Sequence, residues 1–215
     1  MADNDSREGK RYTTPAILDY VNKTHAGHDP ALAQAFAVPE GIPAIQVGPS
    51  EGRFLYLLMK LAGAKKVVEV GTLIGYSAIR LANGLPKDGQ VWSIEYEQKH
   101  ADVARRNIER AGLSDRITVV VGKGVDVLPT LDKNGPFDAV FIDADKENYF
   151  RYGQWAVKNL RKGGLVIGDN TFLFGELMAN NDRAKAMRDF HELVAANCES
   201  VSIPTPDGML VGIKK

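Results

Sequence analysis

The sequence predicts an α/β fold, in which a mostly parallel β-sheet carries helices on both faces. Short β-branched apolar runs alternate with amphipathic stretches of about ten to fifteen residues, which is typical of βα repeats. The runs are apolar nearly throughout, as expected for parallel strands that are covered on both faces. Near the C-terminus the alternation stops, and two late strands joined by a short turn must pair antiparallel.

The first 44 residues precede the βα repeats. Residues 1–12 are too polar to pack alone and predict a mobile tail. Apolar residues recur at helical spacing between Thr14 and Phe36, with a turn-like stretch over 26–30, and predict two short helices. After a loop that contains proline and glycine, Ser50 is expected to cap a helix over about 51–61.

The alternating part of the chain is expected to hold strands over residues 66–70, 90–95, 117–121, 139–142 and 164–168. The helices between these strands centre on Ser77, Val103, Val127 and Gln154. A helix over 184–196 and closing strands near 201–203 and 209–213 complete the chain. Because no repeat, low-complexity tract or linker interrupts residues 1–215, a single domain is predicted.

The chain contains 27 Lys and Arg residues and 27 Asp and Glu residues, so no excess charge attracts it to nucleic acid or an anionic membrane. A dedicated polyanion-binding protein is therefore disfavoured. The lone Cys198 cannot form an internal disulfide, and no apolar run approaches the roughly 18 residues of a membrane span. The polar N-terminus lacks the apolar core of a signal peptide, so we expect a cytoplasmic protein outside the membrane.

A loop with two glycines follows the first predicted strand. Gly71 lies where this strand ends and Gly75 where the next helix begins, and the lack of side chains would let a ligand approach the backbone. A tight turn that binds nothing is the alternative, although open α/β sheets bind ligands at this edge. Nicotinamide dinucleotides require G-x-G-x-x-G, and the Glu69 carboxylate would repel their pyrophosphate. That carboxylate instead suits the cationic amino-acid part of S-adenosylmethionine, which we expect as the ligand.

The next two strand ends extend this predicted site. Glu95 ends the second strand, and its carboxylate can accept two hydrogen bonds, which suits the paired ribose hydroxyls of an adenosine. The alternative is an acid that favours a helix N-terminus for dipole reasons alone. Gly122 and Gly124 follow the third strand and open another approach to the backbone, which we expect beside the adenine.

Two acids and an amide follow the fourth and fifth strands. Asp143 and the pair Asp169-Asn170 can converge, because the carboxyl ends of parallel strands share the edge where the glycine loop lies. Three oxygen donors suit a hard cation such as Mg²⁺ or Ca²⁺, whereas helix caps or turns are the alternative for each residue. Lys146 lies three residues beyond Asp143. A lysine that is partly desolvated beside a cation gives up its proton readily and can then act as a base; an ordinary surface lysine is the alternative.

Aromatic residues are frequent in the same part of the sequence. Phe172 and Phe174 follow the predicted metal residues in a loop, and we expect both at the wall of an aromatic pocket. The other aromatic residues nearby are expected to pack in the core: Tyr149, Phe150, Tyr152 and Trp155.

Several blocks of the sequence, in order, resemble the cation-dependent O-methyltransferase family, which includes caffeoyl-coenzyme A O-methyltransferases, catechol O-methyltransferase and bacterial relatives. The similarity runs from about Ile45 to the C-terminus. The blocks that carry it span residues 45–52, 69–77, 141–149, 169–171 and 207–208. The resemblance implies a Rossmann-like class I methyltransferase sheet of seven strands with an antiparallel last strand, and it implies a homodimer.

The resemblance also implies an activity: methyl transfer from S-adenosylmethionine to a hydroxyl of a small catechol-like or phenylpropanoid aromatic substrate, with Mg²⁺ as the expected metal and Ca²⁺ or Mn²⁺ as alternatives. The expected donor site, which includes the four glycines described above, comprises Val47, Glu69, Gly71, Gly75, Ser77, Glu95, Gly122, Gly124 and Asp143. The expected metal ligands are Asp143, Asp169 and Asn170, and the expected catalytic residues are Lys146, as the base, and Asp143. The first 44 residues and the loop 172–181 are expected to shape the acceptor pocket.

Three alternatives to this function remain open. A family member that methylates a hydroxylated uridine in transfer RNA would share every block, although the balanced charge argues against an RNA substrate. A nicotinamide-dependent oxidoreductase is disfavoured because the loop lacks a third glycine. A binding protein that has lost its chemistry is disfavoured because Asp143, Lys146, Asp169 and Asn170 are all present.

Overall fold

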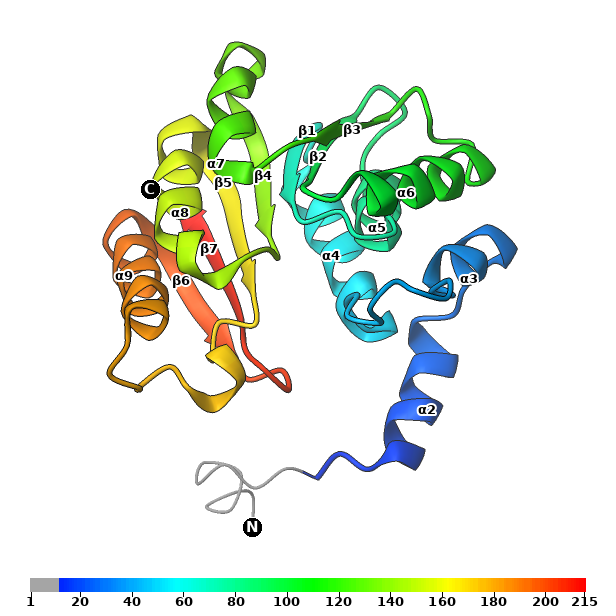
Figure 1. The fold of residues 1–215 in the computed structure, drawn as a ribbon, viewed down its shortest axis with the longest axis horizontal. Coiled ribbons are helices and arrows are strands. Elements are labelled where there is room, and N and C mark those ends of the chain that lie inside the picture. The colour runs from blue at the N-terminus through cyan, green and yellow to red at the C-terminus, as the bar shows by residue number, and fades with distance from the viewer. Residues whose placement is uncertain (1–11) are drawn as a thin grey trace.

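The computed structural model describes residues 12–215 and contains a seven-stranded sheet in the order β3-β2-β1-β4-β5-β7-β6 (Figure 1). The predicted mobile tail over 1–12 therefore falls almost entirely outside the described residues. The strands are β1 (Lys66–Val70), β2 (Gln90–Glu95), β3 (Ile117–Val121), β4 (Phe137–Ile142), β5 (Leu160–Asp169), β6 (Cys198–Ile203) and β7 (Met209–Lys214). Only β7 runs against its neighbours in this sheet, because it pairs antiparallel with both β5 and β6. The predicted fold class, including the antiparallel last strand, is confirmed.

Helices cover both faces of the sheet (Figure 1). On one face lie α4 (Pro49–Ala62), α5 (Tyr76–Gly84) and α6 (Gln98–Arg110), and on the other lie α7 (Gly124–Val127), η1 (Leu128–Asn134), α8 (Tyr149–Asn159) and α9 (Asp182–Asn197). The remaining elements are α2 (Pro15–His25), α3 (Pro30–Phe36), η2 (Lys146–Asn148) and η3 (Leu173–Gly175). No helix among residues 12–215 has the length and apolar character needed to cross a membrane.

The two faces of the sheet belong to two hydrophobic clusters. Val67 of β1 packs with α4 and α5, whereas its neighbour Val68 packs with α8 and α9 on the opposite face. This alternation follows from the two-residue repeat of a strand. Because each face needs apolar side chains, nearly every residue of a central strand is buried, which explains the continuous apolar runs in the sequence.

Two local predictions were wrong. Helix α4 begins at Pro49 after the N-cap Gly48, not after Ser50, and the Glu51 carboxylate accepts a hydrogen bond from the Gly48 N–H (2.7 Å). Proline favours the first position of a helix because that N–H has no partner within the helix. The helix expected around Val127 is only the short α7, and the chain continues as the 3-10 helix η1, because Pro129 cannot donate a backbone hydrogen bond.

The direction in which strands are added to the sheet reverses between β1 and β4. The chain runs outward from β1 through β2 to β3, then crosses back to place β4 on the other side of β1. Such a switch point leaves room for a ligand at the carboxyl ends of the strands. The backbone N–H of Asp143 donates to the Val70 carbonyl (2.8 Å), so the ends of β1 and β4 meet directly.

Candidate active site

A cavity of about 900 Å³ lies at this edge of the sheet. Nine of the predicted site residues line it: Val47, Gly71, Ser77, Glu95, Gly122, Gly124, Asp143, Lys146 and Asn170. The tertiary structure thus brings together residues that are up to 123 positions apart in the sequence, from Val47 to Asn170. Glu69, Gly75 and Asp169 do not line the cavity, and Glu69 and Asp169 are buried next to residues that do.

The two glycines of the loop have different surroundings. Gly71 adopts a φ of +103°, and a Cβ atom there would lie 1.9 Å from the Asp143 carbonyl oxygen. Glycine is therefore required where the ends of β1 and β4 meet. Gly75 caps α5 with a φ of +85°, and a Cβ atom there would lie 3.2 Å from the Ala104 Cβ of α6. Its missing side chain accommodates helix packing, away from the cavity lining.

Glu69 of β1 is completely buried. Its Oε2 atom accepts a hydrogen bond from Ser93 on β2, whose hydroxyl also contacts Thr72. Its Oε1 atom has no hydrogen-bond partner among the described residues. Burial raises the pKa of Glu69 to about 7, and the hydroxyl groups of Ser77 and Ser93 oppose part of that rise. The buried Oε1 atom could therefore accept a donor or a cation that a ligand supplies.

Glu95 at the end of β2 is fixed by the loops around it. Its Oε2 accepts from the Leu73 N–H (2.7 Å) and its Oε1 from the Glu97 N–H (2.9 Å), while His100 Nδ1 lies 3.5 Å from Oε1. The carboxylate lines the cavity and keeps further lone pairs for a ligand. Beside it, a Cβ atom at Gly124 would lie 2.8 Å from the Tyr152 ring, so the glycine lets α7 approach α8.

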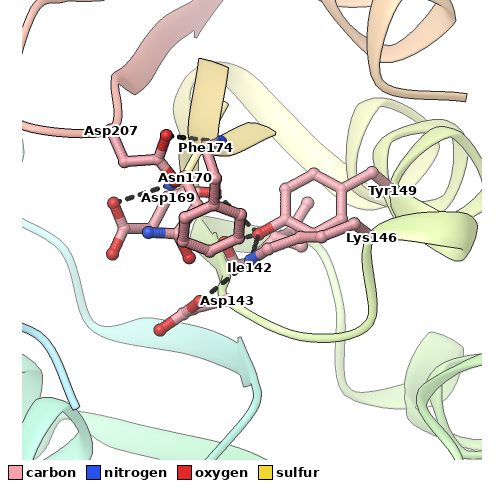
Figure 2. Close-up of polar contacts among 8 residues, drawn as sticks. All are labelled: Ile142, Asp143, Lys146, Tyr149, Asp169, Asn170, Phe174 and Asp207. Atoms are coloured by element: carbon pink, nitrogen blue, oxygen red, sulfur yellow. Dashed lines mark hydrogen bonds and ion pairs between the residues drawn. The ribbon is translucent and has the colours of Figure 1, made fainter. Parts of the chain in front are cut away.

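Asp143 and Lys146 form an ion pair in the cavity wall (Figure 2). The Lys146 Nζ donates to Asp143 Oδ1 (3.2 Å) and to the hydroxyl of Tyr149 (2.7 Å). Both partners come from the short segment that turns from β4 into η2 and α8. The Lys146 side chain is only 8% exposed, so the reading of Lys146 as an ordinary surface lysine is wrong.

Tyr149 was predicted to be a packing residue, and its ring is fully buried against Phe190. Its hydroxyl also contacts the carbonyl oxygens of Asp169 (2.8 Å) and Ile142 (3.1 Å). Burial, with the nearby charges of Asp143 and Asp169, raises the pKa of Tyr149 well above its ordinary value, so the hydroxyl keeps its proton. The hydrogen bond to Lys146 depends on the mutual placement of β4, β5 and α8, and the sequence pattern contained no signal for it.

Asp169 and Asn170 follow β5, as predicted. Asp169 is only 4% exposed, and its Oδ1 accepts from the backbone N–H of Asn170 (2.8 Å), which adopts a φ of +53°. Burial raises the pKa of Asp169 to about 7, and the negative charges of Asp143 and Glu51 add to the rise. The two carboxylates therefore act on each other across the ends of neighbouring strands. In the view of Figure 2, the Asp143, Asp169 and Asn170 side chains lie on one side of the Lys146 amine.

The residues that could hold a cation provide oxygen atoms alone. Across residues 12–215, no group of three or more His, Cys, Asp or Glu side chains has the arrangement of a metal site. The predicted set of two carboxylates and the Asn170 amide would therefore leave positions for water or for a substrate, as hard cations commonly do.

The N-terminal segment reaches the wall of the cavity through Tyr76. This tyrosine lines the cavity, and its hydroxyl contacts His28 Nε2 (2.9 Å) and accepts from Arg80 Nε (3.2 Å). The ring of Phe36 lies edge-on to it, with centroids 5.0 Å apart. Burial, followed by the nearby Arg80 charge, lowers the pKa of His28. Helix α3 and the residues before it therefore support one side of the site.

The cavity is also lined by residues that the sequence pattern did not single out, including Arg183 and His100. Phe174 lines the cavity and is 64% exposed, in agreement with the prediction. Phe172 does not line it and instead packs over Gly208, where a Cβ atom would lie 2.5 Å from the ring. The expectation that Phe172 forms part of the pocket wall was therefore wrong, because the turn before β7 covers its ring.

Comparison with known proteins identifies the family. A family model described as O-methyltransferase matches residues 30–215. A catechol O-methyltransferase of Mycobacterium tuberculosis is 46% identical over 175 residues (80% of this chain, 79% of the relative). One of Niastella koreensis is 42% identical over 211 residues (93% of each chain). The crystal structure of an O-methyltransferase from Bacillus cereus in complex with SAH superposes with a TM-score of 0.86 at 39% identity and covers 93% of this chain and 97% of that one. The resemblance found in the sequence is confirmed: the chain belongs to the O-methyltransferase family.

Proposed function

We propose that this O-methyltransferase transfers a methyl group from S-adenosylmethionine to a hydroxyl of a small catechol-like or phenylpropanoid substrate, and that it depends on a divalent cation. One observation carries the proposal: the same cavity is lined by the glycine loop, by Glu95, and by Asp143, Lys146 and Asn170. A donor site and a deprotonation site in one enclosure are what methyl transfer to oxygen requires, because donor and acceptor must meet in line.

The surroundings of Glu69 and Glu95 support the methyl donor. The buried Oε1 of Glu69 lacks a partner, and a cationic amino-acid group would supply both a hydrogen-bond donor and a compensating charge. Glu95 keeps lone pairs that suit ribose hydroxyls. The Bacillus cereus relative was crystallised with SAH, the product that remains when S-adenosylmethionine has lost its methyl group.

The chemistry of Asp143, Asp169 and Asn170 supports a divalent cation. The carboxyl of Asp169 is buried beside Asp143, which raises its pKa to about 7, and a cation between the two would relieve both burial and repulsion. The oxygen-only donor set favours Mg²⁺ over a softer metal. A bound cation would hold adjacent oxygens of the acceptor and make its hydroxyl more acidic.

Lys146 is proposed as the base. Its amine lines the cavity next to Asp143 and is nearly buried, so it can contact a substrate hydroxyl without competition from bulk water. The hydrogen bonds to Asp143 and Tyr149 hold the amine in place. Lys146 would accept the hydroxyl proton while the oxygen takes the methyl group.

The acceptor class rests on the relatives and on the cavity. Two of the relatives are named catechol O-methyltransferases. The cavity of about 900 Å³ is of a size that suits a donor together with a small aromatic molecule, since ligand sites commonly measure about 300–1,000 Å³. A transfer RNA substrate is the second candidate, and the equal numbers of acidic and basic residues argue against it.

A substrate screen tests the proposed function. Catechol, dihydroxycinnamate esters and hydroxyuridine-containing transfer RNA are incubated with labelled S-adenosylmethionine, with Mg²⁺ and with excess chelator. We expect methylation of vicinal diphenols that is lost in chelator and restored by Mg²⁺. Full activity in chelator would refute the role of the metal, and labelling of transfer RNA alone would refute the acceptor class.

We also propose that the protein is a homodimer. Helix α2 has no buried residue, and it exposes Ile17, Leu18 and Tyr20 to 47%, 45% and 68%. Figure 1 shows that this helix projects from the rest of the protein. A second copy would cover its apolar side chains. Sedimentation equilibrium tests this, and a single species of 23.5 kDa at micromolar concentration would contradict it.

A further inference from the structure

The hydroxyl of Tyr149 lies at the centre of three contacts from different parts of the fold (Figure 2). It is 2.7 Å from Lys146 Nζ, 2.8 Å from the Asp169 carbonyl oxygen and 3.1 Å from the Ile142 carbonyl oxygen. The ring is fully buried and packs edge-on to Phe190, with centroids 5.4 Å apart. The hydroxyl therefore has little freedom to move.

The chemistry of these partners determines which atom donates each hydrogen bond. The carbonyl oxygens of Asp169 and Ile142 can only accept, so the single proton of the Tyr149 hydroxyl is directed toward them. The phenolic oxygen is then left to accept, and Lys146 is the donor it meets. The carboxylate of Asp143, the second partner of Lys146, also accepts.

These directions orient the lysine amine. The amine nitrogen is tetrahedral and has three directions besides its bond to the side-chain carbon. Two of them point at Tyr149 and Asp143, so one direction remains, and Lys146 lines the cavity in which the acceptor would lie. Without the Tyr149 hydroxyl the side chain could rotate, and the remaining direction would face the acceptor for only part of the time.

We propose that Tyr149 is a positioning residue, which holds the Lys146 amine so that its remaining bonding direction faces the substrate hydroxyl. The inference rests on the proposed function, because it requires Lys146 to act as the base. It adds a residue from the first turn of α8 that does not line the cavity in which donor and acceptor would bind.

Tyr149 also joins the ends of β4 and β5 through the two carbonyl oxygens. The test must therefore separate an effect on the orientation of the Lys146 amine from an effect on the stability of the folded protein. Tyr149→Phe removes the hydroxyl and keeps the ring. Trp155→Phe is the matched control, because it lies on the same helix and loses a partly buried hydrogen bond, from Nε1 to Asp132 Oδ1 (2.7 Å), outside the cavity lining. Active-site concentration is determined for each variant by titration with S-adenosylmethionine, and rates are normalised to it.

For Tyr149→Phe we expect kcat to fall by about 10- to 100-fold, while acceptor KM and donor Kd stay within about threefold, because misplacement of a catalytic group affects the chemical step. Trp155→Phe should keep kcat within about twofold. If normalised kcat of Tyr149→Phe is also within about twofold of the native enzyme, or if its loss lies in KM, the inference is overturned. Should Tyr149→Phe fold poorly, Tyr149→Met removes the same hydroxyl with a more adaptable side chain and is judged by the same criteria.

The Lys146→Ala background separates this inference from the proposed function. If Tyr149 acts through Lys146, adding Tyr149→Phe to Lys146→Ala should lower kcat by no more than about a further twofold. A further loss as large as in the native background would show that Tyr149 acts independently and would overturn the inference. If Lys146→Ala itself keeps the native rate, the proposed base fails as well.

Discussion

The substitution Glu69→Gln tests whether the buried carboxylate of Glu69, in the proposed donor site, lowers the free energy of unfolding of the protein without its ligand. Glu69 is completely buried, its Oε1 has no hydrogen-bond partner among the described residues, and burial raises its pKa from 4.5 to about 7. Glutamine has nearly the same shape and can still bond to Ser93, but it carries no charge. The protein without its ligand should therefore become more stable when Glu69 is replaced.

The expected size follows from the pKa. A group with a raised pKa in the folded state holds its proton more tightly there, so the free energy of unfolding falls as the pH rises from 4.5 to about 7. The rise of about 2.5 units corresponds to about 3 kcal/mol at pH 8, at 1.36 kcal/mol per unit. Glu69→Gln should thus raise the free energy of unfolding by up to about 3 kcal/mol at pH 8, and the gain should vanish toward pH 4.5. The raised pKa of Asp169 acts in the same direction but is present in both proteins.

Urea unfolding, followed by tryptophan fluorescence at pH 5 and pH 8 without ligand, measures this difference. Glu109→Gln, on the exposed side of α6, is the control for removal of a surface carboxylate and should change little. Calorimetry should show that Glu69→Gln weakens binding of S-adenosylmethionine, because we propose that the buried charge of Glu69 binds the cationic group of the donor. If the variant and the native protein have the same free energy of unfolding at pH 8, the buried charge of Glu69 does not destabilise the protein. If the variant gains as much free energy of unfolding at pH 5 as at pH 8, the gain does not come from removal of that charge.

Three further substitutions have definite expectations. Asp169→Ala should abolish turnover and leave donor affinity nearly unchanged by calorimetry, and Mg²⁺-dependent activity in the variant would contradict its role as a ligand. Lys146→Ala should lower kcat by about 10²- to 10⁴-fold with little effect on donor affinity. An equal loss in kcat and in donor affinity would indicate that Lys146 binds the donor instead. Gly71→Ala should cost at least about 2 kcal/mol in urea unfolding, because its Cβ would lie 1.9 Å from the Asp143 carbonyl oxygen and its φ is +103°. A stable Gly71→Ala protein would show that the ends of β1 and β4 are not in contact.

Much of the architecture is visible in the sequence because it depends on neighbours along the chain. The runs that form β1, β2 and β3 have the bounds expected from their β-branched residues alone. The strand ends also direct attention to Asp143, Lys146 and Asn170, since all parallel strands end at one edge of the sheet. The helix start at Pro49 and the short helix α7 were missed, although both are explained by the presence of a proline.

The tertiary structure decided which of these residues meet. Strand order places β4 beside β1 although β2 and β3 intervene in the sequence, and this neighbourhood, rather than any local pattern, requires glycine at position 71 next to Asp143. Burial turns Glu69 and Asp169 into carboxyl groups with raised pKa values. The hydrogen bonds of Tyr149 join β4, β5 and Lys146. Periodicity reports only whether a side chain faces the core, whereas desolvation and hydrogen bonding depend on which atoms pack around it, and those atoms come from distant parts of the chain.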